Sequence, residues 1–382
     1  MFFGFASRLA GLYAAIFVMN GIHLPFFPLW LKAKDLNAAE IGAVLAVPML
    51  IRLLAVPVTT RIADRREALR EAIVVATLLS VGGYLLVAFA SGFGWILLAF
   101  AAASLVFTPL MPLVEAYALK GLAARGRAYG PVRLWGSAAF VLGSFVAGLA
   151  TDAIAARHLI WLIVAGTVII AFSAATLMPL APKALGVRAP APQSGLLRSR
   201  MFIAIVLAAS LIQASHATYY GFSALAWRAQ GYDGMTIAAL WGLGVAAEIV
   251  LFGVQARLPA FVTPAMLLMC GAFGGAVRWT AMAFDPPALV LPLLQVLHAA
   301  SFGASHLGAQ MYLARTVPSG QGATAQGYLA IAMGLVMAAT TALSGLLYAA
   351  YGAASYGAMA LAAIAGGVCA LIAHRPRQIA AI

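Results

Sequence analysis

Charged side chains are scarce in this sequence. They make up 9% of its 382 residues, whereas soluble domains carry about 25%. Hydrophobic residues account for 64%, and the apolar runs are long enough to cross a bilayer as helices. The ten-residue alternation that is typical of a membrane β-barrel does not occur. The composition therefore predicts an all-α integral membrane protein.

Several motifs that carry chemistry are also missing. The two cysteines, Cys270 and Cys369, both lie in apolar runs, so no disulfide framework is expected. No HExxH or CxxC pattern and no GxxxxGK[ST] loop occurs, so we expect no metal site and no ATP-driven transport by this chain. For a hydrolase, Ser301 one turn from His298 is the nearest nucleophile and base, and it is weak. We expect a protein that is not an enzyme and has no cofactor except a coupling proton.

Most of the sequence consists of long apolar segments. Twelve are predicted, at about 5–31, 38–60, 68–90, 93–119, 130–151, 158–179, 199–227, 235–256, 261–283, 287–314, 323–349 and 352–373. The first continues past residue 20 and is expected to be a retained helix rather than a cleaved signal. A Pro- and Ala-rich break separates two sets of six. This predicts a six-helix bundle at 1–180, a cytoplasmic linker at 181–198 and a second six-helix bundle at 199–382.

The basic residues predict that both ends of the chain are cytoplasmic. With the N-terminus inside, four basic residues fall on the outer side of the membrane: Lys32, Lys34, Arg157 and Arg228. Three fall within predicted segments: Arg52, Arg133 and Arg278. All the others lie on the cytoplasmic side, as the positive-inside rule requires. The net charge of +13 therefore reflects membrane topology and not nucleic-acid binding.

An acid and a base lie at matched depth near the cytoplasmic face. Glu115 is five residues before Lys120, and Arg133 is six residues after Arg127. At ~1.5 Å per helical residue, both lie roughly 8–9 Å inside the same face of the membrane. We interpret them as a pair or a shared polar site, with a purely structural ion pair as the alternative.

Two further pairs match in depth. Arg52 and Glu248 each lie nine residues before a cytoplasmic arginine, roughly 14 Å deep. Arg278 and His298 lie roughly 26–27 Å from the cytoplasmic ends of their segments. A charge at the bilayer centre costs on the order of 2.5–3.5 kcal/mol, so these groups should face one another or a water-filled cavity. A structural bridge is the alternative for Arg52 and Glu248.

The remaining membrane histidines are His23, His216 and His306, and we expect them to be helix–helix hydrogen-bonding groups. Aromatic residues such as Trp135 and Phe140 could line a pocket, although aromatics at segment ends are more often interfacial anchors.

Two sets of six segments with buried charges describe a two-bundle secondary transporter. Six stretches resemble the major facilitator superfamily, in particular the branch that contains lactose permease and phenylpropionate permease-like transporters. They are GIHLPFFPLWLK (21–32), TTRIADRREALR (59–70), VEAYALK (114–120), GPVRLWG (130–136), AVRWTAMAF (276–284) and LQVLHAASFGASHLG (294–308). The second resembles the loop signature of the superfamily at Asp64 and Arg65, with Thr60 in place of its glycine.

The resemblance implies roles for single residues. Glu115 and Arg133 match the sugar-binding acid and arginine of lactose permease. Arg278 and His298 match its coupling arginine and histidine, and Glu248 matches its helix-eight glutamate. The sequence departs from the sugar permease at four positions: Ser301 for a glutamate, Phe140 for a tryptophan, Met111 for a small residue, and the additional Arg52.

These departures favour a proton-coupled importer of a small organic acid, such as the aromatic carboxylate 3-phenylpropionate, that works by alternating access. Arg52 or Arg133 would bind the carboxylate, Trp135 and Phe140 its apolar part, and Glu248 the proton. A sugar:proton symporter, a drug or sugar exporter and a non-transporting sensor stay open as alternatives. We expect a monomer in the bacterial inner membrane, whose partners are the small molecule, protons and lipid but not nucleic acid.

Overall fold

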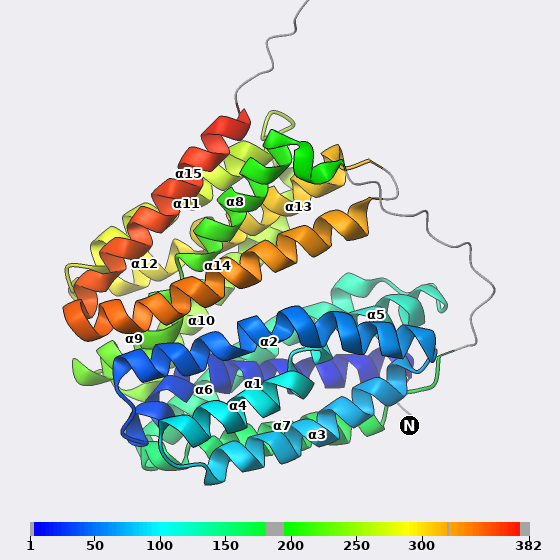
Figure 1. Ribbon diagram of the computed structural model, residues 1–382, viewed down its shortest axis with the longest axis horizontal. Coiled ribbons are helices and arrows are strands. Elements are labelled where there is room, and N and C mark those ends of the chain that lie inside the picture. Colours follow the sequence, from blue (N-terminus) through cyan, green and yellow to red (C-terminus); the bar gives the residue numbers. More distant parts are fainter. Residues whose placement is uncertain (1–3, 181–194, 319–320, 375–382) are drawn as a thin grey trace, which may run out of the picture. The chain divides into compact units, whose positions relative to one another are not determined.

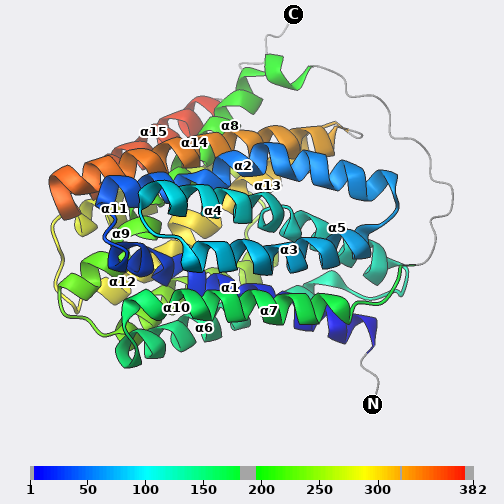
Figure 2. The ribbon, with the colours of Figure 1, turned by 60° about the horizontal axis from the view of Figure 1, so that its bottom comes forward.

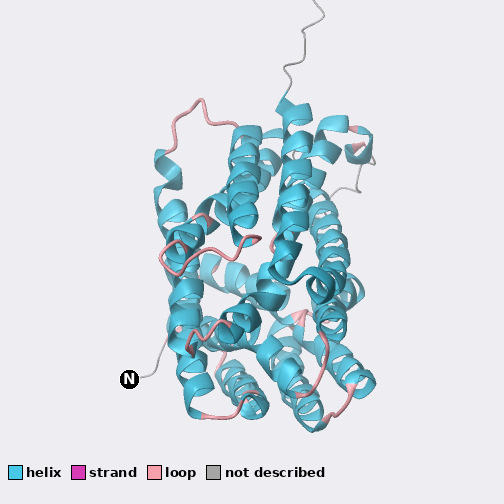
Figure 3. Cartoon of the chain, turned by 90° about the vertical axis from the view of Figure 1, so that its left-hand side faces the viewer, coloured by secondary structure: helices cyan, strands magenta, loops and turns pink. Residues whose placement is uncertain are grey.

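The computed structural model describes residues 4–180, 195–318 and 321–374. Every regular element in these residues is helical, and Figure 3 shows helices joined by short loops. The helices before the linker are α1 (Phe5–Ala33), α2 (Ala38–Arg65), α3 (Leu69–Phe89), α4 (Phe93–Phe107), α5 (Leu110–Ala123), α6 (Tyr129–Ala153) and α7 (Ile160–Ala175). Those after it are α8 (Arg200–Ala214), α9 (Ala217–Ala229), α10 (Gly234–Val254), α11 (Pro264–Met282), α12 (Leu291–Val296), α13 (Ser305–Thr316), α14 (Gly322–Tyr351) and α15 (Tyr356–His374).

Short helical segments complete the set. A π-helical segment, η4 (Ala299–Ala304), lies between α12 and α13. Four 3-10 segments are η1 (Ala156–His158), η2 (Leu196–Arg198), η3 (Gln255–Arg257) and η5 (Gly352–Ser355).

Ten stretches of the described residues are long and apolar enough to cross a membrane. The difference from the twelve predicted segments has two sources. One stretch, Thr324–Ala373, contains both α14 and α15. The predicted segment 287–314, which is divided among α12, η4 and α13, is not among the ten. The number twelve therefore stays a prediction.

The chain forms two compact units by its internal contacts. The first holds Met1–Gly186 and Tyr220–Gly242, and the second holds Val187–Tyr219 and Leu243–Ile382. The predicted division at 1–180, 181–198 and 199–382 stays a prediction, and residues 181–194 of its linker lie outside the described part of the chain.

In the first unit α1 lies alongside α6 and α7, as Figures 1 and 2 show. Glycine permits the close approach of α1 to α6. A Cβ on Gly143 would collide with the carbonyl oxygen of Val18, and one on Gly21 would collide with that of Phe140. Small residues at such contacts are typical of helix packing in membranes, where backbones approach closely.

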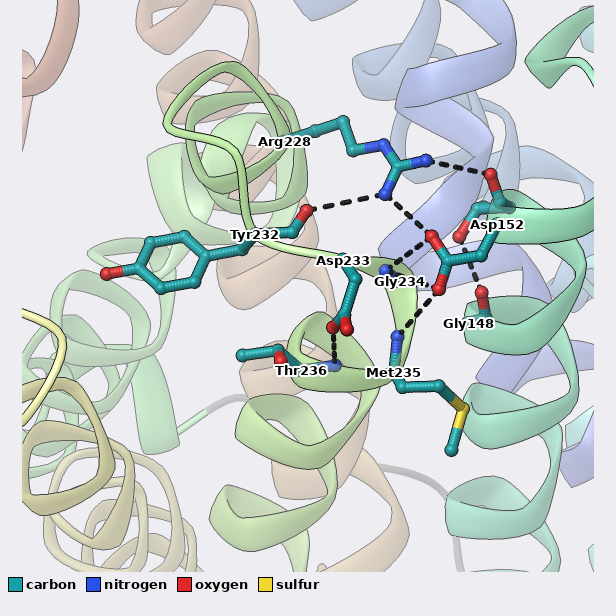
Figure 4. A network of polar contacts seen from close by, with 9 residues as sticks. Gly148, Asp152, Arg228, Tyr232, Asp233, Gly234, Met235 and Thr236 are labelled. Carbon is teal, nitrogen blue, oxygen red and sulfur yellow. Dashed lines mark hydrogen bonds and ion pairs between the residues drawn. The ribbon is translucent and has the colours of Figure 1, made fainter.

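A hairpin formed by α9 and α10 is anchored within the first unit by Asp152 near the end of α6 (Figure 4). The Asp152 carboxylate accepts hydrogen bonds from the backbone N–H of Gly234 at 2.9 Å and of Met235 at 3.3 Å. It also accepts one from Arg228 at 2.7 Å, and the second nitrogen of that guanidinium donates to the carbonyl of Thr151 at 2.9 Å. The carboxylate thus binds the first N–H groups of α10, where the helix dipole favours a negative charge.

The second unit is built around α8, which packs against α13, α14 and α15. Its core includes Phe202, Ile205, Ile212, Leu268 and Leu329, each at most 3% exposed. Glycines again bring helices together: Gly271 and Gly274 of α11 face Ser305 and the η4 backbone. This packing holds η4, and the polar residues beside it, in a fixed place within the unit.

Candidate functional site

Two polar clusters, one in each unit, contain half of the predicted site residues. In the first unit, Glu115 of α5 and Arg133 of α6 come together, with 3.5 Å between Oε1 of Glu115 and Nε of Arg133. Tyr129, one turn before Arg133 on α6, donates a hydrogen bond from its hydroxyl to Oε2 of the same carboxylate. Both charged side chains are 31% exposed, so the pair can exchange its partners with water or a ligand.

The guanidinium of Arg133 lies on aromatic rings of α1. It is 4.2 Å from the ring centre of Phe17 and 5.6 Å from that of Tyr13, which are cation–π distances. Gly136 makes this position possible, because a Cβ there would lie 2.8 Å from Nη1 of Arg133 and 2.9 Å from the Phe17 ring. A planar cation flanked by aromatic rings is suited to bind a carboxylate attached to an apolar group.

The second cluster surrounds Arg278 of α11, whose side chain is fully buried. Its guanidinium donates to the ring Nδ1 of His298 at 3.1 Å and to Oε1 of Gln295 at 2.6 Å. The guanidinium also lies over two aromatic rings, with the ring centres of Tyr219 and Trp279 each 4.5 Å away. A buried arginine in a membrane helix requires such acceptors for its N–H groups, because each unsatisfied polar group is costly in hydrocarbon.

These hydrogen bonds determine the tautomer of His298. A guanidinium can only donate, so Nδ1 of His298 accepts and the ring proton is on Nε2. Nε2 lies 3.4 Å from Oε2 of Glu248, on α10, and therefore directs its N–H toward that carboxylate. Arg278, His298 and Glu248 form a chain in which each donor faces the next acceptor.

A second buried histidine, His216, has the opposite tautomer. Nδ1 of His216 lies 3.1 Å from the carbonyl oxygen of Gln213, which can only accept, so Nδ1 carries the proton. Nε2 then accepts the hydroxyl proton of Ser301 at 3.2 Å. Ser301, which stands in place of the expected glutamate, is thus hydrogen-bonded to the buried His216 between α8 and α9.

The π-helical segment η4 begins immediately after His298. A π turn displaces backbone hydrogen bonds, and such turns are frequent at functional sites. Gln213 of α8 stabilises this one by donating to the carbonyl of Phe302 at 3.1 Å and to the Ser305 hydroxyl at 2.9 Å. The turn places His298 and Ser301 toward different partners, Arg278 and His216.

Other predicted site residues lie apart from these clusters. Arg52 is exposed on α2 and has no hydrogen-bond or ion-pair partner among the described residues. Its predicted meeting with Glu248 would join the two units and stays a prediction. Trp135 is 61% exposed, and at about 100° per residue it points away from Arg133, two positions earlier. Phe140 is buried where α6 contacts α1. Their roles in binding stay untested.

The predicted conformational loop ends α2. Asp64 lies 3.4 Å from Nζ of Lys120, the basic residue at the end of α5, and Arg65 is the last residue of the helix. Thr60, in the place of the expected glycine, donates its hydroxyl to the carbonyl of Val56 in its own helix at 2.8 Å. The role of Asp64 and Arg65 in conformational change stays a prediction.

Comparison with known proteins identifies the family. The MFS_1 like family matches residues 6–357. The probable 3-phenylpropionic acid transporter of Escherichia coli (strain K12) is 32% identical over 362 residues, which cover 92% of this chain and 93% of that protein. The chain belongs to the MFS_1 like family. The resemblance to the major facilitator superfamily is confirmed, and the protein is a multi-pass membrane transporter of a small molecule, not an enzyme.

Another relative and two solved structures are also similar to this chain. The maltose permease of Geobacillus stearothermophilus is 28% identical over 334 residues, 85% of this chain and 82% of that protein. The crystal structure of the nucleoside transporter NupG superposes with a TM-score of 0.82 over 97% of this chain and 98% of that one, at 14% identity. A bacterial homologue of the human lysosomal transporter Spinster superposes with a TM-score of 0.69 at 16% identity, over 96% and 94%. The major facilitator fold of this family member is thereby established.

Proposed function

We propose that this transporter is a proton-coupled importer of a small organic acid, with an aromatic carboxylate such as 3-phenylpropionate as the preferred substrate. It would cross the bacterial inner membrane twelve times, in two bundles of six helices with both ends cytoplasmic. The observation that carries the proposal is the hydrogen-bonded chain from Arg278 through His298 to Glu248. A partly buried acid at the end of an ordered donor chain is a suitable place for a transported proton.

Glu248 would carry the proton. While Arg278 donates to His298, the ring presents an N–H to Glu248 in either protonation state of the acid. Protonation removes the negative charge of the carboxyl group but leaves an oxygen that accepts this N–H. The site therefore accommodates both protonation states of Glu248 without rearranging its hydrogen bonds.

Arg133 would bind the substrate carboxylate. Glu115 holds the guanidinium at 3.5 Å in a partly exposed pair, so an incoming carboxylate can compete for it. The ring of Phe17 beside the guanidinium would contact the aromatic part of the substrate. Arg52, exposed and without a partner among the described residues, is a second candidate for the carboxylate. The Escherichia coli relative is named as a probable transporter of 3-phenylpropionic acid, which supports this substrate class.

A sugar:proton symporter is the second candidate. It is favoured by the Glu115–Arg133 pair together with the similarity to a maltose permease. Counterflow in proteoliposomes separates the two functions. Vesicles loaded with unlabelled 3-phenylpropionate should accumulate labelled 3-phenylpropionate, and vesicles loaded with maltose should not accumulate labelled maltose. Counterflow of maltose alone would contradict the acid proposal.

The variant Glu248→Gln tests the proton site in the same vesicles. Gln keeps the size and the acceptor oxygen but binds no transported proton. Counterflow should persist, because it needs no net proton movement, whereas accumulation driven by a pH gradient should be lost. The matched control is Glu40→Gln, an exposed acid that only caps α2. Unchanged gradient-driven accumulation in Glu248→Gln would exclude Glu248 as the carrier.

A further inference from the structure

A groove of about 350 Å³ lies between α2, α3 and the end of α4, and it shares no residue with either polar cluster. Its walls are apolar side chains that are nonetheless about half exposed: Ile62, Val75, Leu79 and Leu105. These apolar walls, and the separation of the groove from both polar clusters, favour a lipid chain over a polar substrate as its occupant.

Alanines at helical spacing produce this groove. Ala72 and Ala76 lie one turn apart on α3, and Val75 and Leu79 continue the same face. Ala63 of α2, which is buried, completes the floor. Longer side chains at these alanines would fill the space, so the groove results from the sequence of α3 and not from a loose helix contact.

The two ends of the groove differ in polarity. Arg66, the residue that caps the end of α2, and Glu71, in the first turn of α3, line one end. Leu79 lies eight residues further along α3, about 12 Å toward the membrane centre. A ligand that follows the groove would have a polar head beside Arg66 and an apolar chain beside Leu79.

The charges at the polar end favour an anion. The Glu71 carboxylate lies 3.7 Å from Nη1 of Arg70, and Asp64 pairs with Lys120. Arg66 is exposed and has no ion-pair partner among the described residues. In the proposed orientation this end lies at the cytoplasmic headgroup level, where basic residues attract anionic lipids.

We infer that this groove is a binding site for one anionic phospholipid, with an acyl chain against Ala72 and Ala76 and the phosphate on Arg66. The site rests on the proposed cytoplasmic orientation and not on the proposed substrate. Lipid enclosed between three helices would link α2 to α3 and α4, and would stabilise the first unit by binding only its folded form.

The test uses the full-length protein, purified in detergent and delipidated. Native mass spectrometry counts bound lipid and thermal unfolding measures its effect, with phosphatidylglycerol, phosphatidylethanolamine and phosphatidylcholine compared. The wild type should retain one phosphatidylglycerol and be stabilised by it more than by the other two. Arg66→Gln should weaken its apparent affinity about fivefold, the effect of one basic residue near an anionic headgroup, and Arg61→Gln, an exposed arginine outside the groove, should not.

Ala72→Leu should fill the groove and abolish the specific retention of phosphatidylglycerol. Its control is Ala165→Leu, which adds the same bulk at an exposed position of α7. If Ala72→Leu unfolds, the retention of phosphatidylglycerol by Arg66→Gln still shows whether the groove binds an anionic phospholipid. Equal retention by Ala72→Leu and the wild type, or equal stabilisation by all three lipids, would overturn the inference. Counterflow of 3-phenylpropionate is measured separately in phosphatidylcholine vesicles, so either proposal can fail without the other.

Discussion

At the scale of single residues, the polar clusters depend on neighbours that carry no charge. Tyr129 lies four residues before Arg133 and donates to its partner Glu115, whereas Gln295 lies three before His298 and accepts from its partner Arg278. Each thus shares a helix face with one member of its cluster and binds the other. Sequence alone located the charged residues because a charge is rare in an apolar segment. It did not identify Tyr129 or Gln295, since polar uncharged residues are common in such segments. Helical spacing from a charged residue is the signal that could have found both.

Gly136 is the most specific target at this scale. In Gly136→Ala the new Cβ would lie 2.8 Å from the guanidinium of Arg133 and 2.9 Å from the ring of Phe17, so the cation must leave its place on the ring. Because a side-chain end can move more cheaply than a backbone, the unfolding temperature should change little. If Arg133 binds the substrate, the apparent KM for 3-phenylpropionate should rise about tenfold, a loss of about 1.4 kcal/mol.

Gly130→Ala is the matched control for this prediction. Gly130 lies in the first turn of the same helix, and a Cβ there meets no atom within 4 Å. Its KM should equal that of the wild type. If the KM of Gly136→Ala also stays at the wild-type value, the position of Arg133 does not affect substrate binding.

At the scale of elements, apolar length predicted most helices well and their interruptions poorly. The run 287–314 is continuous in hydrophobicity, yet the structure divides it into α12, η4 and α13. Hydropathy measures the cost of transfer into lipid, whereas the π turn depends on hydrogen bonds that Gln213 supplies from α8. A partner distant in sequence could not be inferred from the composition of the segment itself.

The hairpin of α9 and α10 gives a prediction for this scale. Asp152→Ala removes an acceptor of Arg228 and of the first N–H groups of α10. These groups are partly exposed and can bind water instead. We therefore expect the free energy of unfolding to fall by about 1–2 kcal/mol and the thermal midpoint by about 2–4 °C. A cysteine introduced at Thr236 should also react faster with a water-soluble maleimide.

Asp233→Ala distinguishes anchoring from local capping. Asp233 accepts the backbone N–H of Thr236 at 2.7 Å, and the hydroxyl and N–H of Thr236 hold the pKa of this carboxyl below its ordinary value. Its removal frays the start of α10 but leaves the bonds of Asp152 in place, so the thermal midpoint should fall by less than in Asp152→Ala. Equal effects of the two variants on the thermal midpoint would show that Asp152 acts only as a cap.

At the scale of the whole molecule, the fold class and the family were predictable because both depend on repeated features. Long apolar segments, the distribution of basic residues and six spaced motifs all indicated one architecture. Which buried charges meet depends on helix rotation and on residues from distant segments. Thus Glu115 and Arg133 could be paired from their depth, whereas the contact of His298 with Glu248 could not.

The electrical behaviour of transport gives a prediction about the complete cycle. A carboxylate that crosses with one proton carries no net charge, whereas a neutral sugar with one proton carries one positive charge. A membrane potential supplies about 2.3 kcal/mol per charge for each 100 mV, so it should drive sugar symport but not acid symport. In proteoliposomes, an acidic exterior alone should therefore accumulate 3-phenylpropionate inside. A potassium diffusion potential, negative inside and without a pH gradient, should not. Accumulation driven by the potential alone would contradict one-proton transport of an acid, and a gradient that expels the acid toward the acidic side would indicate an exporter.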